Sequence, residues 1–277
     1  MILCAAQISP CWNDPHASLM KMRQYASEAV EGDAEIIIFP EQILTGWDPR
    51  NTSFTTSDFG QLVQDMRSIA KEVSIGLVGS FRENGGEKPR NTCIAIGSDG
   101  SILAKYSKIH LFSPAGEDQY YEPGDGLGYF TYDSCVVGLA ICYDLRFAPL
   151  FQAYRDHGVH LMLVPAAWPA SRIEHFHLFT KSRALEFQMF VAAVNTIGLT
   201  PVDNYSGGSC IAGPDGIIRA QGSDLEELIF YNINPEEVTD MRRNFPVHRD
   251  YSKIDYNTLF PEKKDYKTRI RSLTDSS

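Results

Sequence analysis

Short apolar runs recur along this chain, and stretches with apolar side chains three or four residues apart lie between them. The runs are rich in Val, Ile and Leu, which is typical of strands that are buried on both faces. Two turn sequences, at 98–100 and 213–216, predict hairpins, the second between 209–212 and 217–220. We predict further strands at 2–8, 35–39, 75–81, 91–97, 134–142, 160–164 and 189–194.

The spaced stretches predict amphipathic helices. In the first, Asp14 can cap the helix, Pro15 suits its first position, and Leu19 and Met22 share one face. Further helices are expected at 59–73, 149–156 and 173–188. Strands that alternate with helices indicate an α/β protein. Because no linker or repeat divides the chain, we expect one domain over residues 1–260 and an appended tail over 261–277.

Composition narrows the class of protein. With 277 residues and 43% hydrophobic content, the chain can bury a large core. No run approaches the roughly 20 apolar residues of a membrane span, and no basic leader precedes the first apolar segment, so we expect an unexported, cytoplasmic protein. The net charge of -10 disfavours nucleic acid and anionic membranes as partners. Six cysteines without a Cys-x-x-Cys pair argue against zinc and disulfides.

Cys142 stands where chemistry is expected. It ends the apolar run 134–142, and the next residues, Tyr143-Asp144-Leu145-Arg146, turn abruptly polar. Open α/β sheets place their reactive groups at the carboxyl ends of strands. The thiol is therefore a candidate nucleophile. A buried structural cysteine is the alternative, since free Cys is among the most buried residue types.

Two ionisable residues follow other predicted strands. Glu41 comes after Pro40 at the end of the run 35–39, and Lys108 lies among apolar neighbours beyond the first hairpin. A carboxylate can take the thiol proton, the sulfur can attack a carbonyl, and an ammonium can stabilise the oxyanion. The lysine charge would also lower the thiol pKa from its free value of about 8.5. A solvated loop glutamate and a snorkelling surface lysine are the alternatives.

Other polar residues near Cys142 allow different arrangements. His110 or His175 could form a papain-like dyad with the cysteine, although Glu41 already supplies a base and both histidines are interpreted as loop supports. Asp144 and Arg146 are expected to orient the turn after Cys142 by an internal ion pair. Substrate contact by Arg146 is the alternative.

Three motifs occur in order along the chain: Phe39-Pro40-Glu41, Lys108-Ile109-His110-Leu111 and Cys142-Tyr143-Asp144-Leu145-Arg146. Together they resemble the nitrilase, or carbon–nitrogen hydrolase, superfamily. The resemblance extends over nearly the whole chain and includes Glu117 within 116–125, the segment 165–169, His175 and the segment 183–186.

This resemblance implies a role for each residue. Cys142 would be the nucleophile, Glu41 the general base and Lys108 the oxyanion partner, with Glu117 positioning the lysine and the substrate. The backbone N–H of Tyr143 would be the second oxyanion donor. The resemblance also implies a four-layer α-β-β-α sandwich, which the strand and helix pattern alone does not distinguish from a doubly wound sheet. A homo-oligomer that needs neither metal nor organic cofactor is implied as well.

The expected reaction is hydrolysis of a small amide through a thioester. Tyr143-Asp144 after the cysteine favours an amide, because nitrilases of this superfamily usually carry Trp-Glu there and aliphatic amidases Arg-Asp. The motif is similar to the branch that holds omega-amidases, which act on 2-oxoglutaramate and 2-oxosuccinamate, and deaminated-glutathione amidases. Such substrates carry a carboxylate, which needs a cation or amide donors to bind it. Candidate substrate-binding residues are Arg146, Trp168, Arg172 and Arg50.

Two alternatives stay open at this point. An N-carbamoyl amide hydrolase, which releases carbon dioxide as well as ammonia, is the nearest enzymatic alternative, and Arg146 does not exclude it. A catalytically silent member that uses the same fold as a binding module is the other.

Overall fold

The computed structural model describes residues 1–250 of the chain and divides it into two units, Met1–Asn244 and Phe245–Ser277. The described part of the second unit holds the short 3-10 helix η4 (Val247–Arg249). The predicted tail at 261–277 lies outside the described residues. All that follows concerns the first unit.

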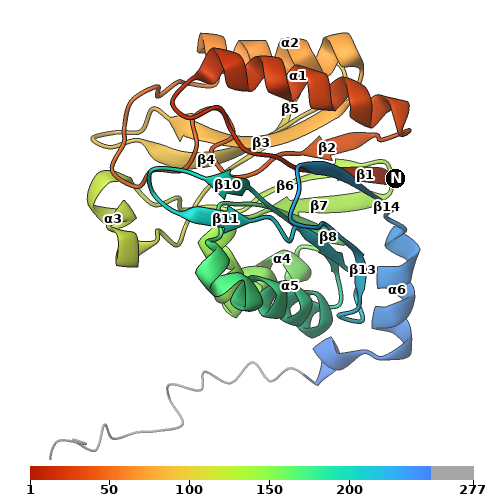
Figure 1. The fold of residues 1–277 in the computed structure, drawn as a ribbon. Helices are drawn as coiled ribbons and strands as arrows, with labels where there is room; N and C mark the ends of the chain where they lie inside the picture. Colours follow the sequence, from red (N-terminus) through yellow and green to blue (C-terminus); the bar gives the residue numbers. More distant parts are fainter. Residues whose placement is uncertain (251–277) are drawn as a thin grey trace, which may run out of the picture. The chain divides into compact units, whose positions relative to one another are not determined.

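Residues 1–244 form two six-stranded sheets (Figure 1). The first has a parallel centre, β1–β2–β3, and antiparallel edges. Its strands, in spatial order, are β14 (Glu227–Asn232), β1 (Ile2–Gln7), β2 (Ile36–Ile38), β3 (Gly76–Glu83), β4 (Arg90–Ile96) and β5 (Ile102–Ser107).

The second sheet repeats this plan, with β7, β8 and β9 parallel at its centre. Its strands, in spatial order, are β13 (Ile218–Gln221), β12 (Cys210–Ala212), β9 (Phe190–Asn195), β8 (Leu161–Ala166), β7 (Cys135–Leu139) and β6 (Gly128–Tyr132). A small ribbon of β10 (Ile197–Leu199) and β11 (Asn204–Ser206) follows β9. The predicted hairpin across 213–216 is confirmed, because β12 and β13 pair antiparallel.

Helices cover the outer face of each sheet (Figure 1). α1 (Pro15–Glu31) and α2 (Gln61–Val73) lie on the first sheet, and α4 (Ala148–Asp156) and α5 (Ile173–Phe187) lie on the second. Asp14 caps α1 as predicted, since its side chain accepts a hydrogen bond from the Ala17 N–H at 3.0 Å. α6 (Pro235–Asn244) follows β14.

Alternation along the strands produces two cores. In β1, Leu3 and Ala5 pack among the residues between the two sheets, whereas Cys4 and Ala6 pack with the helices α1 and α2. Both faces of the strand are apolar because both are covered. The unit is therefore the four-layer α-β-β-α sandwich that the family resemblance implies.

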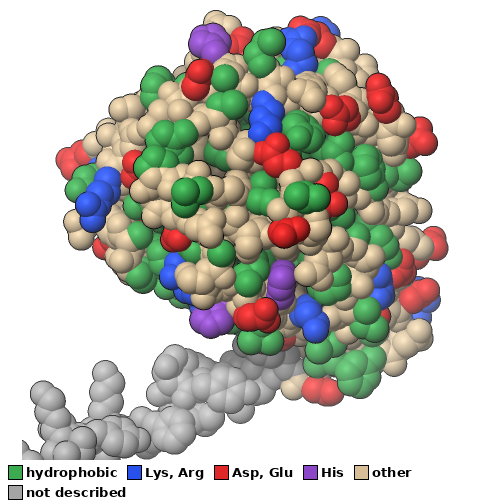
Figure 2. Space-filling view, in the orientation of Figure 1, with side chains coloured by type: hydrophobic (Ala, Val, Ile, Leu, Met, Phe, Trp, Pro, Cys, Tyr) green, Lys and Arg blue, Asp and Glu red, His purple; other side chains and the backbone are tan. Residues whose placement is uncertain are grey.

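Acidic and basic side chains lie interspersed on the face shown in Figure 2. No helix within residues 1–250 is long and apolar enough to cross a membrane.

Candidate active site

Cys142 does not end a strand, in contrast to the prediction. β7 stops at Leu139, and the Asp144 carboxylate accepts the Ile141 N–H at 3.0 Å, which replaces a sheet partner for this group. The chain then turns into the 3-10 helix η2 (Cys142–Arg146), whose first residue is the cysteine. Cys142 has φ +46°, in the left-handed region that residues other than glycine rarely adopt. Backbone outliers of this kind cluster at functional sites.

Glu41, Lys108 and Glu117 form a buried ionic cluster beside this turn. The Lys108 ammonium lies 2.8 Å from Glu41 Oε1 and 2.9 Å from Glu117 Oε2. Glu41 follows β2, Lys108 follows β5, and Glu117 begins the short helix α3 (Glu117–Tyr120). All three side chains are at most 1% exposed. The fold thus brings together three residues that the sequence analysis singled out and that lie far apart in the chain.

Neutral donors complete the bonding of the two carboxylates. Asn91 Nδ2 donates to Glu41 Oε1 at 2.7 Å and to Glu117 Oε1 at 3.2 Å. The backbone N–H groups of Ala167 and Phe112 donate to Glu41 Oε2 and Glu117 Oε2, at 3.0 and 2.7 Å. Each carboxylate therefore meets several donors, which offsets the cost of its burial.

The electrostatics favour a protonated thiol and a charged lysine in the resting site. Burial and the Glu41 charge raise the pKa of Cys142 well above its ordinary value and outweigh the lowering by Lys108. Burial also raises the pKa of Glu41, against the lowering by Lys108. Although burial opposes the charge of Lys108, Glu117 and Glu41 raise the pKa of this lysine well above its usual value. The thiol therefore needs a base, and Glu41, whose charge acts directly on the pKa of Cys142, is the carboxylate beside it that can serve.

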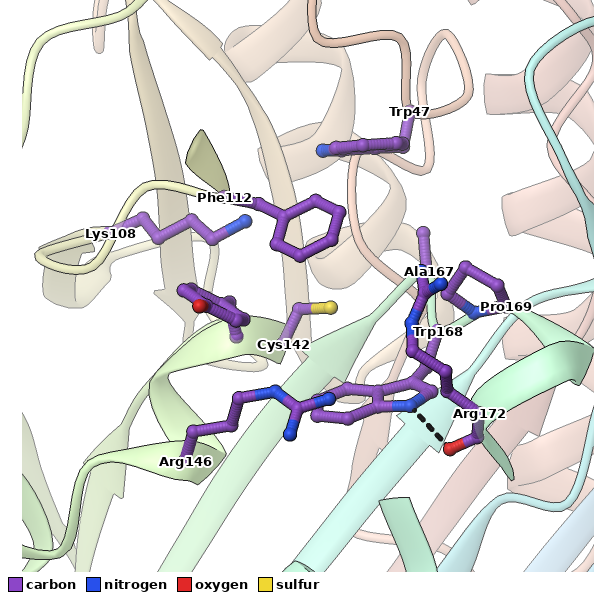
Figure 3. A pocket seen from close by; sticks show the side chains of 10 residues that line it. Trp47, Lys108, Phe112, Cys142, Arg146, Ala167, Trp168, Pro169 and Arg172 are labelled. Atoms are coloured by element: carbon purple, nitrogen blue, oxygen red, sulfur yellow. Dashed lines mark hydrogen bonds between the residues drawn. The ribbon is translucent and has the colours of Figure 1, made fainter. Parts of the chain in front are cut away.

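A pocket opens onto the cysteine. Figure 3 shows the Cys142 Sγ pointing into the space between Phe112 and Arg172, with Trp47 and Trp168 on opposite sides. Its wall combines four aromatic residues with three cations. The lining residues are Trp47, Lys108, Phe112, Cys142, Tyr143, Arg146, Ala167, Trp168, Pro169 and Arg172.

Arg146 and Arg172 lie in this pocket without a carboxylate. Within residues 1–250 neither guanidinium takes part in an ion pair. The Arg146 guanidinium lies 4.8 Å from the centre of the Trp168 ring, and Arg172 lies 5.6 Å from that of Phe112. Partial burial lowers the pKa of Arg146, and repulsion from the positive charge of Arg172 lowers it further. Arg50 does not line the pocket.

The predicted ion pair between Asp144 and Arg146 is wrong. Asp144 is fully buried and accepts instead from Tyr106 Oη at 2.8 Å, from the Ile141 N–H and from His110, through both its backbone N–H and Nδ1. Because these bonds already satisfy the carboxylate, Arg146 is left to face the pocket. His110 thus supports the turn, and His175 Nδ1 lies 3.3 Å from Arg146 Nη2. Neither histidine is bonded to the cysteine in the described part of the chain.

No three His, Cys, Asp or Glu side chains within the described residues are arranged to hold a metal ion.

Comparison with known proteins agrees with this geometry. Residues 3–243 match the model of the carbon–nitrogen hydrolase family. The chain belongs to this family. It is 30% identical to the 2-oxoglutaramate amidase of Bacillus subtilis over 236 residues, 84% of this chain and 91% of that protein. It is 31% identical to the omega-amidase of Homo sapiens over 260 residues, 90% of this chain and 93% of that protein.

Solved structures show the same fold. An amidase from Nesterenkonia sp. is 25% identical, with a TM-score of 0.80 over 91% of this chain and 96% of that one. A carbon–nitrogen hydrolase superfamily protein from Xanthomonas campestris has a TM-score of 0.82 at 24% identity, over 92% and 98% of the two chains. The predicted four-layer sandwich and the predicted enzyme class, a hydrolase of carbon–nitrogen bonds, are confirmed.

Sequence reasoning missed three contributors to the site. Asn91 bridges the two glutamates, and Trp47 and Phe112 form pocket walls. Trp47 and Phe112 each stand a few residues after a motif glutamate or lysine, but an aromatic residue in a loop carries no signal of its own. Asn91 does carry one, because a polar residue at the start of a buried strand needs a partner.

Proposed function

We propose that this protein is an omega-amidase, which hydrolyses the terminal amide of a small 2-oxo acid such as 2-oxoglutaramate or 2-oxosuccinamate. The observation that carries the proposal is the pair of guanidinium groups, Arg146 and Arg172, that face an aromatic pocket without a counter-charge. A substrate carboxylate would supply that charge through charge-assisted hydrogen bonds. The names of the relatives from Bacillus subtilis and Homo sapiens point to the same substrates.

Acylation starts from the resting thiol. Glu41 takes the Cys142 proton as the sulfur attacks the amide carbon, because the thiol pKa is too high for a thiolate to persist beforehand. The oxyanion of the tetrahedral intermediate is stabilised by the Lys108 ammonium and by the Tyr143 backbone N–H. Glu41 then returns the proton to the amide nitrogen, and the carbon–nitrogen bond breaks. Ammonia departs, and the acyl group stays on Cys142 as a thioester.

Deacylation repeats these steps with water. Glu41 removes a proton from a water molecule as its oxygen attacks the thioester carbon, and the same two donors stabilise the second oxyanion. The carbon–sulfur bond breaks, the sulfur takes the proton back, and the acid is released. Glu117 holds Lys108 in place throughout, through the contact of 2.9 Å.

The test is ammonia release from a panel of amides. We expect turnover of 2-oxoglutaramate and 2-oxosuccinamate, with weaker turnover of an uncharged amide of similar length. Release from N-carbamoyl amino acids alone would move the protein to the N-carbamoyl branch, and release from deaminated glutathione alone would move it to that amidase. A folded protein that releases ammonia from none of them would contradict the proposal and favour a silent binding module.

Replacement of Arg172 by methionine tests the carboxylate subsite. We expect Arg172→Met to reduce kcat/KM for 2-oxoglutaramate by about 10- to 100-fold, since a charge-assisted hydrogen bond is worth about 1.5–3 kcal/mol. For an uncharged amide we expect a change of less than about threefold, because no carboxylate is bound. Steady-state ammonia release with both substrates measures the difference.

The matched control is Arg243→Met, because the Arg243 side chain is 69% exposed and pairs only with Asp240 among the described residues. It should change neither substrate's kinetics. Equal losses on both substrates in Arg172→Met would show that Arg172 supports the pocket and does not bind the carboxylate.

A cytoplasmic location and a homo-oligomeric state are further parts of the proposal. Gel filtration tests the oligomeric state.

A further inference from the structure

Asn91 lies at the centre of the ionic cluster, although no motif points to it. It is fully buried on β4, directly opposite Lys108, whose backbone N–H donates to the Asn91 carbonyl at 2.8 Å. Its side-chain amide has two hydrogens. One is directed to Glu41 Oε1 at 2.7 Å and the other to Glu117 Oε1 at 3.2 Å. One residue thus holds the backbone of the lysine and both of its carboxylate partners.

The orientation of this amide is forced by its surroundings. The two carboxylate oxygens accept hydrogen bonds, so only the nitrogen of Asn91 can face them. The Asn91 Oδ1 atom is buried, and no donor reaches it within residues 1–250. An unpaired buried carbonyl oxygen carries a cost, which the two charge-assisted bonds of the nitrogen offset. The side chain is therefore held by the glutamates and not by its own acceptor.

The charges of the cluster explain what such a group can do. Two carboxylates share one lysine, and with a neutral Cys142 thiol the buried cluster carries one excess negative charge. Carboxylates that share a buried site tend to retain a proton between them. The Asn91 N–H donor that faces Glu41 accepts no proton and therefore favours the ionised form of this carboxylate.

We propose that Asn91 is a positioning residue that keeps Glu41 ionised as the base for Cys142 and holds Lys108 between its two carboxylates. The proposal rests on the role of Glu41 proposed above. The ionisable groups that face Glu41 are Lys108 from the end of β5, Glu117 from α3, Cys142 from η2 and Tyr205 from β11. Burial raises the pKa of Tyr205, which keeps this phenol neutral. Lys108 is thus the one cation among these groups.

Two substitutions test this role through the pH dependence of the reaction. Asn91→Ala removes both donors, and Asn91→Asp replaces the amide with a third carboxyl group of the same size. The loss of hydrogen bonds to an ionised carboxylate raises its pKa, so the acidic limb of kcat/KM should move to higher pH. In Asn91→Ala we expect the midpoint to shift by about half to one pH unit. In Asn91→Asp we expect a shift of at least about one unit, which corresponds to a tenfold loss of activity at pH values below the midpoint. Raising the pH should restore part of the activity.

Alkylation of Cys142 by iodoacetamide gives a second readout that needs no substrate. Its pH profile should shift in the same direction, because Glu41 is the group that takes the thiol proton. If the wild type is alkylated with this profile but hydrolyses no amide, the proposed substrate is wrong and the role of Asn91 is still supported. If the wild type hydrolyses its substrate but neither profile shifts in the variants, the role of Asn91 is wrong.

Thr92→Val is the matched control. Thr92 is the next residue on β4 and is also fully buried, but its hydroxyl contacts Glu83 and Ser107, away from the cluster. Its pH profiles should match those of the wild type. A uniform loss of activity at every pH in the Asn91 variants, with an unchanged midpoint, would show a merely structural role and overturn the proposal. Thermal unfolding confirms that each variant is folded.

Discussion

Replacement of Cys142 by alanine should reduce ammonia release by at least about ten-thousand-fold. Removal of a nucleophile in an enzyme with covalent catalysis costs on the order of 10⁴ to 10⁶ in kcat. The fold should persist, because alanine is smaller than cysteine and its side chain fits in the same turn. Alanine and cysteine both carry a Cβ atom, so the substitution leaves the backbone strain at a φ of +46° about the same. Assays of purified variant and wild type, with any amide that the wild type hydrolyses, measure the loss.

Cys210→Ala is the matched control for this experiment. Cys210 is a buried free cysteine in β12, and burial raises its pKa to about 12, so it is an inert thiol of the second sheet. Its replacement should leave kcat within about twofold and lower the thermal midpoint slightly. The nucleophile is misassigned if Cys142→Ala retains more than about one per cent of wild-type turnover while Cys210→Ala loses activity.

Periodicity was sufficient to predict most strands and helices of this fold because their two faces are buried in different ways. β1, β2 and β3 have apolar residues on both faces, since one face meets the second sheet and the other meets α1 and α2. That pattern reveals buried strands but not whether a second sheet or a helix layer lies on a given face. The four-layer arrangement therefore came from the family resemblance, and periodicity alone could not have selected it.

The strand that ends before Cys142 shows a second limit of prediction from the hydrophobic pattern. Residues 134–142 form a continuous apolar run, which predicts a strand to its end. In the structure the Asp144 side chain takes the Ile141 N–H and ends the pairing early. The same carboxylate is satisfied by Tyr106 and His110, both distant in the sequence, so it has no need of Arg146. A prediction from neighbouring residues alone could not have found these partners.

Counting residues along the predicted hairpin locates the partner of Asn91 on the neighbouring strand to within one residue. Equal counting outward from the pair Ile96 and Ile102 would set Asn91 opposite Ser107. A bulge between Ala95 and Ile96 shifts the register by one residue, which pairs Thr92 with Ser107 and so brings Asn91 opposite Lys108. The sequence shows no signal for that bulge. A single irregularity in the ladder thus decides which polar residue joins the site.

Replacement of Lys108 by methionine should reduce both activity and stability. The loss of one oxyanion donor costs about 10² to 10³ in kcat. The same change leaves Glu41 and Glu117 buried without their cation, and breaking a buried ion pair costs about 3–5 kcal/mol. Because Lys108 lowers the pKa of Glu41, its removal raises that pKa further. This part of the stability loss should grow as the pH rises and the buried Glu41 is forced to ionise. Urea unfolding at several pH values measures the effect.

A double variant separates the two effects. In Lys108→Met with Glu117→Gln, one buried carboxylate is removed along with the cation, so much of the lost stability should return while kcat stays at least about a hundredfold below wild type. Lys105→Met is the matched control, because Lys105 also pairs with two carboxylates, Asp58 and Glu83, but its side chain is 33% exposed. Solvent screening should limit its cost to about 1 kcal/mol or less, with activity unchanged. Recovery of wild-type turnover in the double variant would mean that Lys108 only neutralises Glu117, and that the oxyanion is stabilised by backbone donors alone.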